Sequence, residues 1–499
     1  MSDAGARTGG RLLARNSALN VVGLLLPMAT ALVTVPILMR GLGVERFGIL
    51  TVGWVVLGYF GLFDFGLGRA MTKVVAEKLG AGRQEEVPSL AWTSLVLMFL
   101  FGAAGGITLA ALAPWLVGSA FKISPEYRLE ALHTLYLLAF SLPWVISTTG
   151  LSGILEANQS FGVVSSLRTA TGLFSYLSPL LVLPFSKQLV PVIALLVVGR
   201  MLGWGAYLAA CLRTLPFLRR RPPLEWQRAK SLMQLGGWMT VSNVVSPLMT
   251  YFDRFLIGGL ISMAAVAHYV TPYEIVIKLL LIPNGLLGVL FPAFAATFPH
   301  NRLRTSQLLD RGVRVIFLLM FPVVLVLITF AREGMTLWLG QDFARHSAGV
   351  LQWLALGVFI NCLAQAPFAL IQGIGRPDIT GKLHLLEFPL YAGAIWYLSQ
   401  RFGVEGVAMA WVLRVVVDTA ILYFVAGRFL PDGEPLFWGT FRLAAPAVVV
   451  FGLGAVQHDL GDRALFSLVA LVVFGLVAWF WILGPTERAL LQRRTVLDA

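Results

Sequence analysis

Four charged side chains lie in a segment that is apolar enough to enter a lipid bilayer. The segment runs from Ser242 to Asn284 and contains Asp253, Arg254, Glu274 and Lys278. A charge at the centre of a bilayer costs roughly 2.5 to 3.5 kcal/mol on insertion scales, so such residues usually face protein or a water-filled cavity. We therefore interpret this segment as a candidate transport pathway.

Helical spacing groups these charges into two stripes. Arg254 shares one helical face with Thr250, and Lys278 shares another with Glu274. The two faces could line one cavity. Alternatively, Glu274 and Lys278 simply neutralise each other, because residues at i and i+4 are neighbours on a helix surface.

Two arginines are predicted to lie at mid-depth in other apolar segments. Arg200 and Arg414 come about eleven or twelve residues after their segments begin, which places both near mid-bilayer at about 1.5 Å per residue. We expect Arg200 to face a cavity, because a guanidinium facing lipid is costly. Arg414 has Asp418 at i+4. For Arg414, cavity lining and mutual neutralisation both remain open.

Other titratable residues lie in predicted spans. Asp64 and Glu387 are expected nearer the span ends, where a carboxylate can reach the headgroups or cap a helix as well as serve a pathway. His133, His268 and His384 could relay protons near neutral pH. Isolated histidines in spans are more often packing or interface residues, so both interpretations stand.

Composition sets the class of the protein. The chain has 499 residues, of which 58% are hydrophobic and 13% charged, with a mean hydropathy of +0.80. A soluble domain has roughly 45 to 50% apolar residues. About 20 apolar residues span a bilayer as a helix, and the chain contains about fourteen such stretches. The sequence predicts an all-α polytopic membrane protein with about fourteen transmembrane helices.

A polar, basic link divides these helices into two sets. Similar polar turns, ILEANQSFGVVSSL from Ile154 and LIQGIGRPDITGKL from Leu370, occupy corresponding places in the two sets. Together with Arg200 and Arg414 they predict a parallel repeat of two six-helix lobes. The predicted parts are a lobe at 1–212, a link at 213–231, a second lobe at 232–430, and two additional helices with a tail at 431–499.

Proline and glycine positions predict local features of the helices. The apolar segment at 263–298 is longer than a bilayer requires and contains several prolines, including Pro272 and Pro283. We expect this span to be tilted, kinked or partly outside the bilayer. Small residues at i and i+4, as at Gly102 and Gly106, permit close contact between helices.

Charge distribution predicts orientation. The net charge is +13, from 38 Lys and Arg against 25 Asp and Glu. Most of the basic residues fall in the loops on the side of the two termini, which the positive-inside rule places in the cytoplasm. Basic loops facing anionic headgroups explain the charge without nucleic-acid binding. The first apolar segment is interpreted as a retained span and not as a signal peptide.

Catalytic and metal-binding signals are weak. The sequence has no P-loop, HExxH, GxSxG or GxGxxG motif, so ATP-driven export would need another subunit. Cys211 and Cys362 are the only cysteines, and both fall in predicted spans. They form neither a disulfide framework nor a metal-ligand cluster. We expect no cofactor, no metal and no catalytic residue.

Three segments carry a resemblance to a known family. They are SALNVVGLLLPMATALVTVPILMRGLGVERFGILTVGW from Ser17, GLFDFGLGRAMTKVVAE from Gly61, and YFDRFLIGGL from Tyr251 followed by AHYVTPYEIVIKLLLIPNGLLGVLFPAF. In order and spacing they resemble the polysaccharide-transporter flippases, of the O-antigen repeat-unit (Wzx) type. That superfamily also contains multidrug and toxin exporters and lipid II flippases. The resemblance covers about the first 430 residues and implies two six-helix lobes around a central cavity with alternating access.

The resemblance also implies a substrate and partners. The substrate would be undecaprenyl-pyrophosphate-linked oligosaccharide, crossing the bacterial inner membrane for cell-surface polysaccharide biosynthesis. Membrane lipids, a coupling H⁺ or Na⁺, and polysaccharide polymerases or glycosyltransferases would be partners. Arginine can donate two parallel hydrogen bonds to a phosphate, so we expect the pyrophosphate-binding residues to be Arg200, Arg254, Lys278 and Arg414. Candidate counter-ions or ion-coupling residues are Asp64, Asp253, Glu274, Glu387 and Asp418.

Two other functions stay open from the sequence. A multidrug exporter of the same superfamily would use an acid such as Asp64 or Glu274 to bind an organic cation or a coupling ion. A membrane glycosyltransferase or polymerase is a different class. The sequence argues against that enzyme, because it has no large hydrophilic loop for a catalytic domain and no DxD motif.

Overall fold

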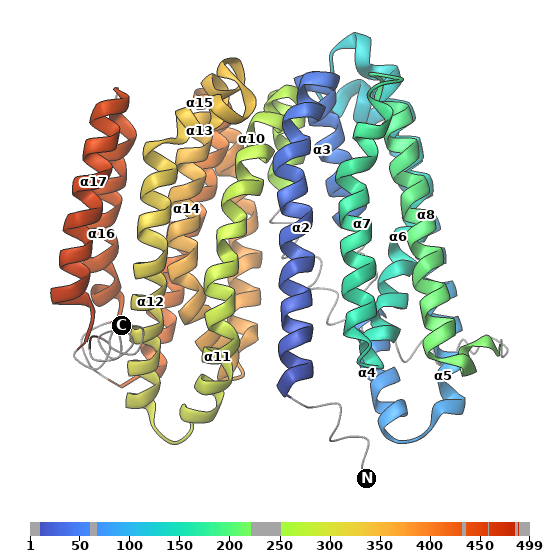
Figure 1. Cartoon of the computed structure of the whole chain (residues 1–499), viewed down its shortest axis with the longest axis horizontal. Helices are drawn as coiled ribbons and strands as arrows, with labels where there is room; N and C mark the ends of the chain where they lie inside the picture. The colour runs from blue at the N-terminus through green and yellow to red at the C-terminus, as the bar shows by residue number, and fades with distance from the viewer. Residues whose placement is uncertain are drawn as a thin grey trace. The chain divides into compact units, whose positions relative to one another are not determined.

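The computed structural model describes residues 10–59, 67–220, 251–431, 436–457, 459–484 and 488, and the regular elements in these ranges are helices (Figure 1). The chain divides into two compact units, Met1–Ala267 and His268–Ala499. Most of the predicted link at 213–231 and the start of the predicted second lobe fall in residues 221–250, outside the described ranges.

The first unit is built from long helices that pack side by side. The segment that follows α5 (Val87–Trp115) holds the helix at 251–260. Lys122 N donates to Gly258 O at 2.9 Å, and the rings of Phe121 and Phe255 stack with their centroids 6.4 Å apart. The elements are α2 (Gly10–Leu42), α3 (Val44–Tyr59), α4 (Leu67–Gly80), α5 (Val87–Trp115), α6 (Arg128–Ala157), α7 (Phe161–Val182), α8 (Leu189–Thr214) and the helix at 251–260, with short 3₁₀ or π turns at Gln84–Glu86, Leu116–Ala120, Pro125–Tyr127 and Pro216–Arg219.

The second unit has the same character. Its elements are most of α10 (Met263–Val276), a 3₁₀ turn at Ile277–Leu280, α11 (Leu281–Thr297), α12 (Arg302–Thr329), α13 (Ala331–Leu339), α14 (Gln341–Gly373), α15 (Pro377–Phe429), α16 (Leu436–Val456), α17 (Leu460–Val477) and a π turn at Ala478–Ile482. The predicted long span at 263–298 is interrupted at the 3₁₀ turn, between Pro272 and Pro283. The 3₁₀ turn is a local change of helix geometry within this span, whose tilt and position in a bilayer stay predictions.

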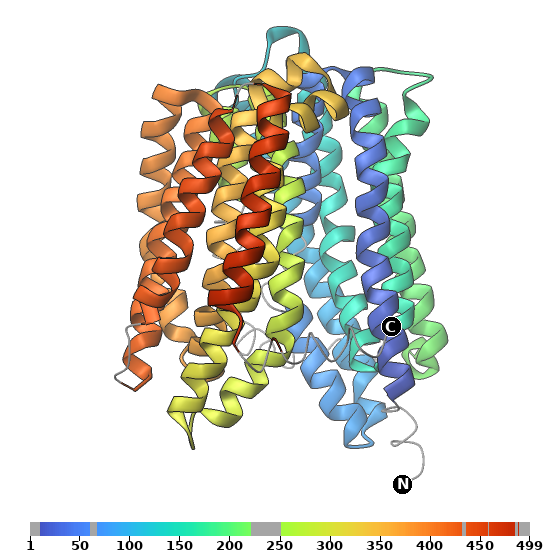
Figure 2. The same cartoon turned by 60° about the vertical axis from the view of Figure 1, so that its left-hand side comes forward.

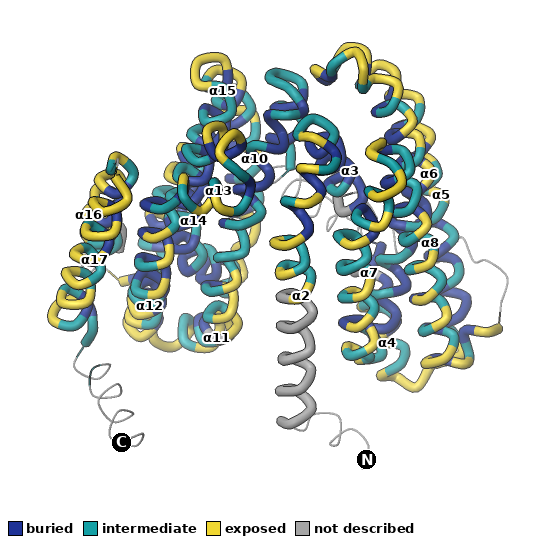
Figure 3. Tube along the Cα trace, turned by 45° about the horizontal axis from the view of Figure 1, so that its top comes forward, coloured by how far each residue is buried: buried dark blue, intermediate teal, exposed yellow. Residues whose placement is uncertain are grey.

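The helices suit a bilayer in length and in surface. Nine helices of the described ranges are long and apolar enough to cross a membrane, and Leu26–Leu42 is a shorter apolar one. Their outer faces carry exposed apolar side chains, as along α17, where Leu465 and Leu468 are each 62% exposed (Figure 3). Such a continuous apolar face is unfavourable in water but meets acyl chains in a bilayer. The predicted all-α polytopic membrane fold is confirmed.

α15 is a helical hairpin, and each of its two arms is long enough to cross a bilayer. Gly403 has a φ of 58° and a ψ of −134°, a backbone conformation that favours glycine and interrupts the helix. The two arms touch near the turn, since a Cβ on Gly406 would overlap the backbone oxygen of Leu398. The sequence predicts two separate spans here, at 383–400 and 403–427, and the two arms correspond to them. Residues equally far from Gly403 on the two arms therefore face each other.

The last two helices, α16 and α17, pack beside α12 within the second unit (Figure 2). Phe474 of α17 stacks on Phe321 of α12 at 4.2 Å between ring centroids, and Phe451 of α16 stacks on the same ring at 5.2 Å. Arg463, at the start of α17, forms an ion pair with Glu333 of α13. The appended helices are thus fixed to α12 and α13.

Close packing of α5 against α6 depends on glycine. A Cβ on Gly102 would lie 2.8 Å from the backbone N of Pro143 and 2.9 Å from the backbone O of Leu142. A Cβ on Gly106 would lie 2.5 Å from the O of Ala139. These contacts are with backbone atoms, which cannot rotate away. The close helix contact predicted from the Gly102 and Gly106 spacing is confirmed.

Gly102→Ala should force α5 and α6 apart and lower the Tm of the purified protein in detergent, because overpacking typically costs about 1–3 kcal/mol. Gly105→Ala is the matched control, since its Cβ would meet only Leu142 Cδ1 at 3.9 Å. Thermal unfolding of both variants checks this. Equal Tm values for the two would contradict the packing argument.

Candidate functional site

Arg200 lies on α8 with much of its hydrogen-bonding capacity unused. One nitrogen, Nη2, donates to Ser175 Oγ of α7 at 3.3 Å. In the described part of the chain Arg200 forms no ion pair with a carboxylate. A guanidinium has five N–H donors, so this side chain can still bind an anion.

Asp253 and Arg254 are inside the first unit. Their exposed fractions are 1% and 4%. Asp253 Oδ1 accepts the backbone N–H of Arg254 at 2.7 Å, and the Arg254 guanidinium lies over the Tyr251 ring at 4.8 Å from its centroid. The cation is therefore packed on an aromatic face, an interaction that strengthens when water is excluded.

Glu274 and Lys278 form the local pair that their spacing allows. Lys278 Nζ lies 3.3 Å from Glu274 Oε2, and the two side chains are 40% and 41% exposed. The geometry favours mutual neutralisation over a separate role for Lys278. Asp64 falls in residues 60–66, outside the described ranges.

The turn at Gly403 brings three titratable side chains together. His384 and Glu387 are on the first arm of α15 and Asp418 is on the second, and one ligand-type atom of each lies within 4.8 Å of the others. In a straight helix Glu387 and Asp418 would be about 46 Å apart at about 1.5 Å per residue. Only the hairpin makes this cluster.

The carboxyl groups of the cluster are buried and poorly satisfied. Glu387 is 5% exposed and Asp418 is 8% exposed. In the described part of the chain, no side-chain or backbone donor reaches Oε1 or Oε2 of Glu387 or Oδ1 of Asp418. Glu387 therefore does not reach the headgroups, as one sequence interpretation allowed. A buried carboxylate without donors is strongly disfavoured, so a cation or a proton belongs here.

Arg414 is close enough to this cluster for its charge to act on both acids. Its guanidinium lies over the Tyr391 ring at 5.3 Å from the centroid, and its Nε has no hydrogen-bond partner. Among the described residues it forms no ion pair, so the neutralisation of Asp418 at i+4 is not made. The Arg414 guanidinium is therefore not neutralised by Asp418 and can bind another anion.

Sequence reasoning underrated His384 and did not identify Tyr391. Two signals could have found them. His384 and Glu387 are at i and i+3 on one face, and Glu387 and Asp418 lie at nearly equal distances from Gly403 along the chain. A turn at that glycine would have predicted the pairing.

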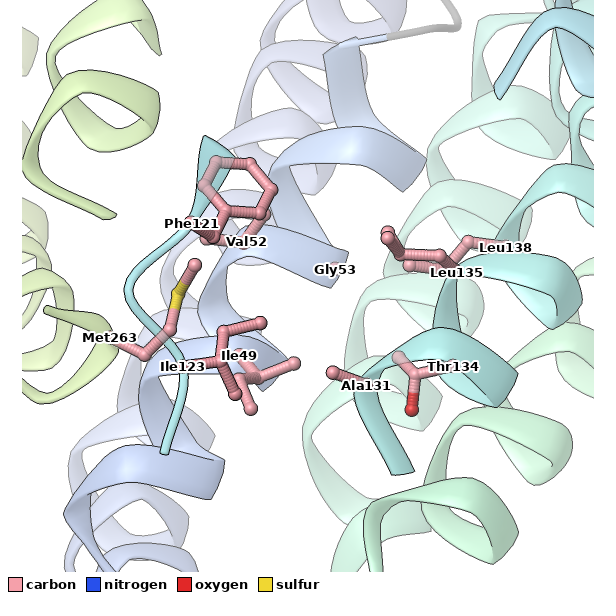
Figure 4. A pocket seen from close by; sticks show the side chains of 10 residues that line it. All are labelled: Ile49, Val52, Gly53, Phe121, Ile123, Ala131, Thr134, Leu135, Leu138 and Met263. Carbon is pink, nitrogen blue, oxygen red and sulfur yellow. The ribbon is translucent and has the colours of Figure 1, made fainter. Parts of the chain in front are cut away.

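The first unit also contains an apolar pocket, which carries no charge (Figure 4). Thr134 is its polar side chain, and the Thr134 hydroxyl is buried without a hydrogen-bond partner. The pocket cannot hold an anion and is not the charged site. Its lining residues are Ile49, Val52, Gly53, Phe121, Ile123, Ala131, Thr134, Leu135, Leu138 and Met263.

Known sequences related to this chain concern polysaccharide export. A family model described as polysaccharide biosynthesis protein matches residues 13–298. The putative O-antigen transporter of Shigella flexneri is 28% identical over 419 residues, which cover 83% of this chain and 97% of that protein. The succinoglycan biosynthesis transport protein ExoT of Rhizobium meliloti is 25% identical over 492 residues, covering 92% of this chain and 90% of ExoT.

Solved structures with the same fold are membrane transporters. The lipid II flippase MurJ, in an inward closed conformation, matches with a TM-score of 0.70 and 12% identity over 93% of this chain and 99% of MurJ. An inward-facing multidrug resistance MATE family transporter of the MOP superfamily matches with a TM-score of 0.63 and 16% identity, over 85% of this chain and 98% of that one. At these identities the likeness shows the fold.

Removing both charges of the Glu274–Lys278 pair should leave the membrane abundance and the Tm close to those of the wild type. A partly exposed pair contributes about 1 kcal/mol or less. The single variant Lys278→Gln removes the cation of this pair but keeps the Glu274 charge, and it should lower abundance more than Glu274→Gln combined with Lys278→Gln. Immunoblotting of membranes compares them. If the double variant is the less abundant one, Lys278 has a role beyond neutralisation.

Proposed function

Because the chain belongs to the polysaccharide biosynthesis protein family, we propose that it is a flippase for undecaprenyl-pyrophosphate-linked oligosaccharide in the bacterial inner membrane. The names of its relatives support polysaccharide transport as the activity, since they include an O-antigen transporter, ExoT and WzxC, a lipopolysaccharide biosynthesis protein. Two of these names describe transport proteins and the third a biosynthesis protein, and together with the transporter fold they identify the chain as a transporter and not an enzyme.

Physical chemistry explains why such a substrate needs this fold. Each unpaired sugar hydroxyl costs several kcal/mol in hydrocarbon, whereas the apolar lipid tail is soluble in it. The protein would therefore shield the sugar and the pyrophosphate while the tail remains in the bilayer. Alternating access suits this task, and structures of the fold are known in inward-facing and outward-facing conformations.

The arginines are the proposed pyrophosphate ligands. Arg200 has one hydrogen bond, to a neutral serine, and Arg414 rests on an aromatic ring without an ion pair in the described part of the chain. Both can therefore turn their planar fork toward a phosphate. Arg254, on the Tyr251 ring, adds positive charge. Lys278, paired with Glu274, is assigned a lesser role.

A multidrug exporter is the second candidate, favoured by the likeness of the fold to MATE transporters. Such an exporter needs an acid that is available to an organic cation. Glu274 already pairs with Lys278, and Glu387 and Asp418 are only 5% and 8% exposed. Dye efflux from cells that produce the protein distinguishes the two functions, because a flippase alone would confer none.

Arg200→Ala and Arg414→Ala should each reduce cell-surface polysaccharide by about tenfold or more in a strain lacking its own flippase. Hydrogen bonds to charged groups contribute about 1.5–3 kcal/mol, which sets this scale. Gel analysis of surface polysaccharide measures the effect, with membrane abundance followed by immunoblot.

The matched control is Arg401→Ala. Arg401 also lies over a tyrosine ring, at 4.7 Å from the Tyr397 centroid, but it is exposed near the turn of α15. Its variant should export like the wild type. Full complementation by each of the alanine variants of Arg200, Arg254 and Arg414 would contradict the proposed anion site.

A further inference from the structure

The proposed function assigns no role to the Glu387–Asp418 pair. The two carboxyl groups come from opposite arms of one hairpin and lie within 4.8 Å of each other and of His384. Three of their four oxygens meet no hydrogen-bond donor among the described residues. Both residues are more than nine-tenths buried. The Gly403 turn brings the two arms, and with them these carboxyl groups, together.

Two ionised carboxylates cannot persist in these surroundings. Like charges at this distance in a medium of low dielectric repel each other, and one of the two groups then keeps a proton. The described charges acting on the pair are His384 and Arg414, both on α15 itself. No ionisable side chain in the described parts of α14 or α16 is among them, although both helices pack against α15.

Arg414 has two alternative positions relative to this pair. In the structure it lies over Tyr391, at 5.3 Å. Asp418 is its i+4 neighbour on the same arm, within reach of an ion pair. A second negative charge on the pair would attract the guanidinium to Asp418. A proton on the pair removes that attraction and leaves Arg414 available to another anion.

We propose that Glu387 and Asp418 share a proton whose presence controls whether Arg414 can bind the pyrophosphate of the substrate. The control of substrate binding rests on the proposed function, whereas the proton site does not. Loss of the proton places Arg414 on Asp418 and releases the pyrophosphate. Because coupling between two ligands is reciprocal, pyrophosphate binding in turn favours proton uptake by the pair.

His384 gives the proton a route. It is only partly buried, in contrast to the two acids, and its ring lies against Phe368 of α14 at 6.4 Å between centroids. A neutral imidazole can accept a proton on one nitrogen and donate from the other. The proton therefore enters at the less buried member of the cluster and passes to the carboxyl pair.

Infrared spectroscopy of the purified full-length protein tests the proton site without any substrate. The wild type should show the C=O band of a protonated carboxyl group at neutral pH, and Glu387→Gln and Asp418→Asn should each lose it. Asp378→Asn is the matched control, because Asp378 is an exposed acid on the same helix that pairs with Arg376. That variant should keep the band.

Two outcomes of the infrared experiment would overturn the proposal. One is a band that survives in both the Glu387 and Asp418 variants. The other is a metal ion found by elemental analysis in stoichiometric amount in the wild type and lost in Glu387→Gln, because the pair would then hold a metal and not a proton.

Binding of inorganic pyrophosphate at several pH values tests the control of Arg414. Wild-type affinity should fall as pH rises, by up to roughly tenfold per pH unit for one linked proton, with proton uptake on binding. Asp418→Asn should bind independently of pH, and Asp378→Asn should follow the wild type. Wild-type binding that does not change with pH overturns the coupling. Absence of wild-type binding defeats the proposed function instead, and the infrared result then decides the proton site alone.

Discussion

A charge inside a lipid bilayer must be enclosed by protein, and the polar residues of this chain are arranged around that constraint. Asp253 and Arg254 are almost completely buried, Glu387 and Asp418 are sequestered within a hairpin, and Glu274 is accompanied by Lys278. Apolar residues fill most of the interior around these charges, and leucines of α17 are exposed on the outside. The buried charges are therefore enclosed by helices whose exposed surface is compatible with hydrocarbon.

Close helix packing makes that enclosure possible. Gly102 and Gly106 let α5 contact the backbone of α6, and Gly406 lets the arms of α15 meet. In a bilayer, helices gain little from apolar burial alone, so association depends on close van der Waals contact of this kind. The hairpin formed at Gly403 and Gly406 also brings Glu387 and Asp418 together. Close packing of the two arms and the carboxyl pair therefore depend on the same turn.

The charged groups differ in how completely they are paired with other groups of the protein. The Glu274–Lys278 pair is locally complete, and the Arg463–Glu333 pair serves to fix α17 on the second unit. Among the described residues, Arg200 is held by a serine hydroxyl and Arg414 by an aromatic ring. Weakly held cations are suited to an anion that must be bound and then released, as the proposed lipid-linked pyrophosphate would be.

Much of the fold could be predicted from the sequence, because each transmembrane helix is specified by about 20 apolar residues of its own chain. The helical class, the break near Pro272 and Pro283, the glycine contacts of α5 and the local Glu274–Lys278 pair are all determined within a few helical turns. The sequence also indicated Arg200 and Arg414 through their depth. The pairing of Glu387 with Asp418, the inclusion of His384 and the placement of Arg414 on Tyr391 were decided by the tertiary structure. They depend on the angle at which the chain reverses at Gly403, and a turn between distant residues leaves no periodic signal in the sequence that surrounds it.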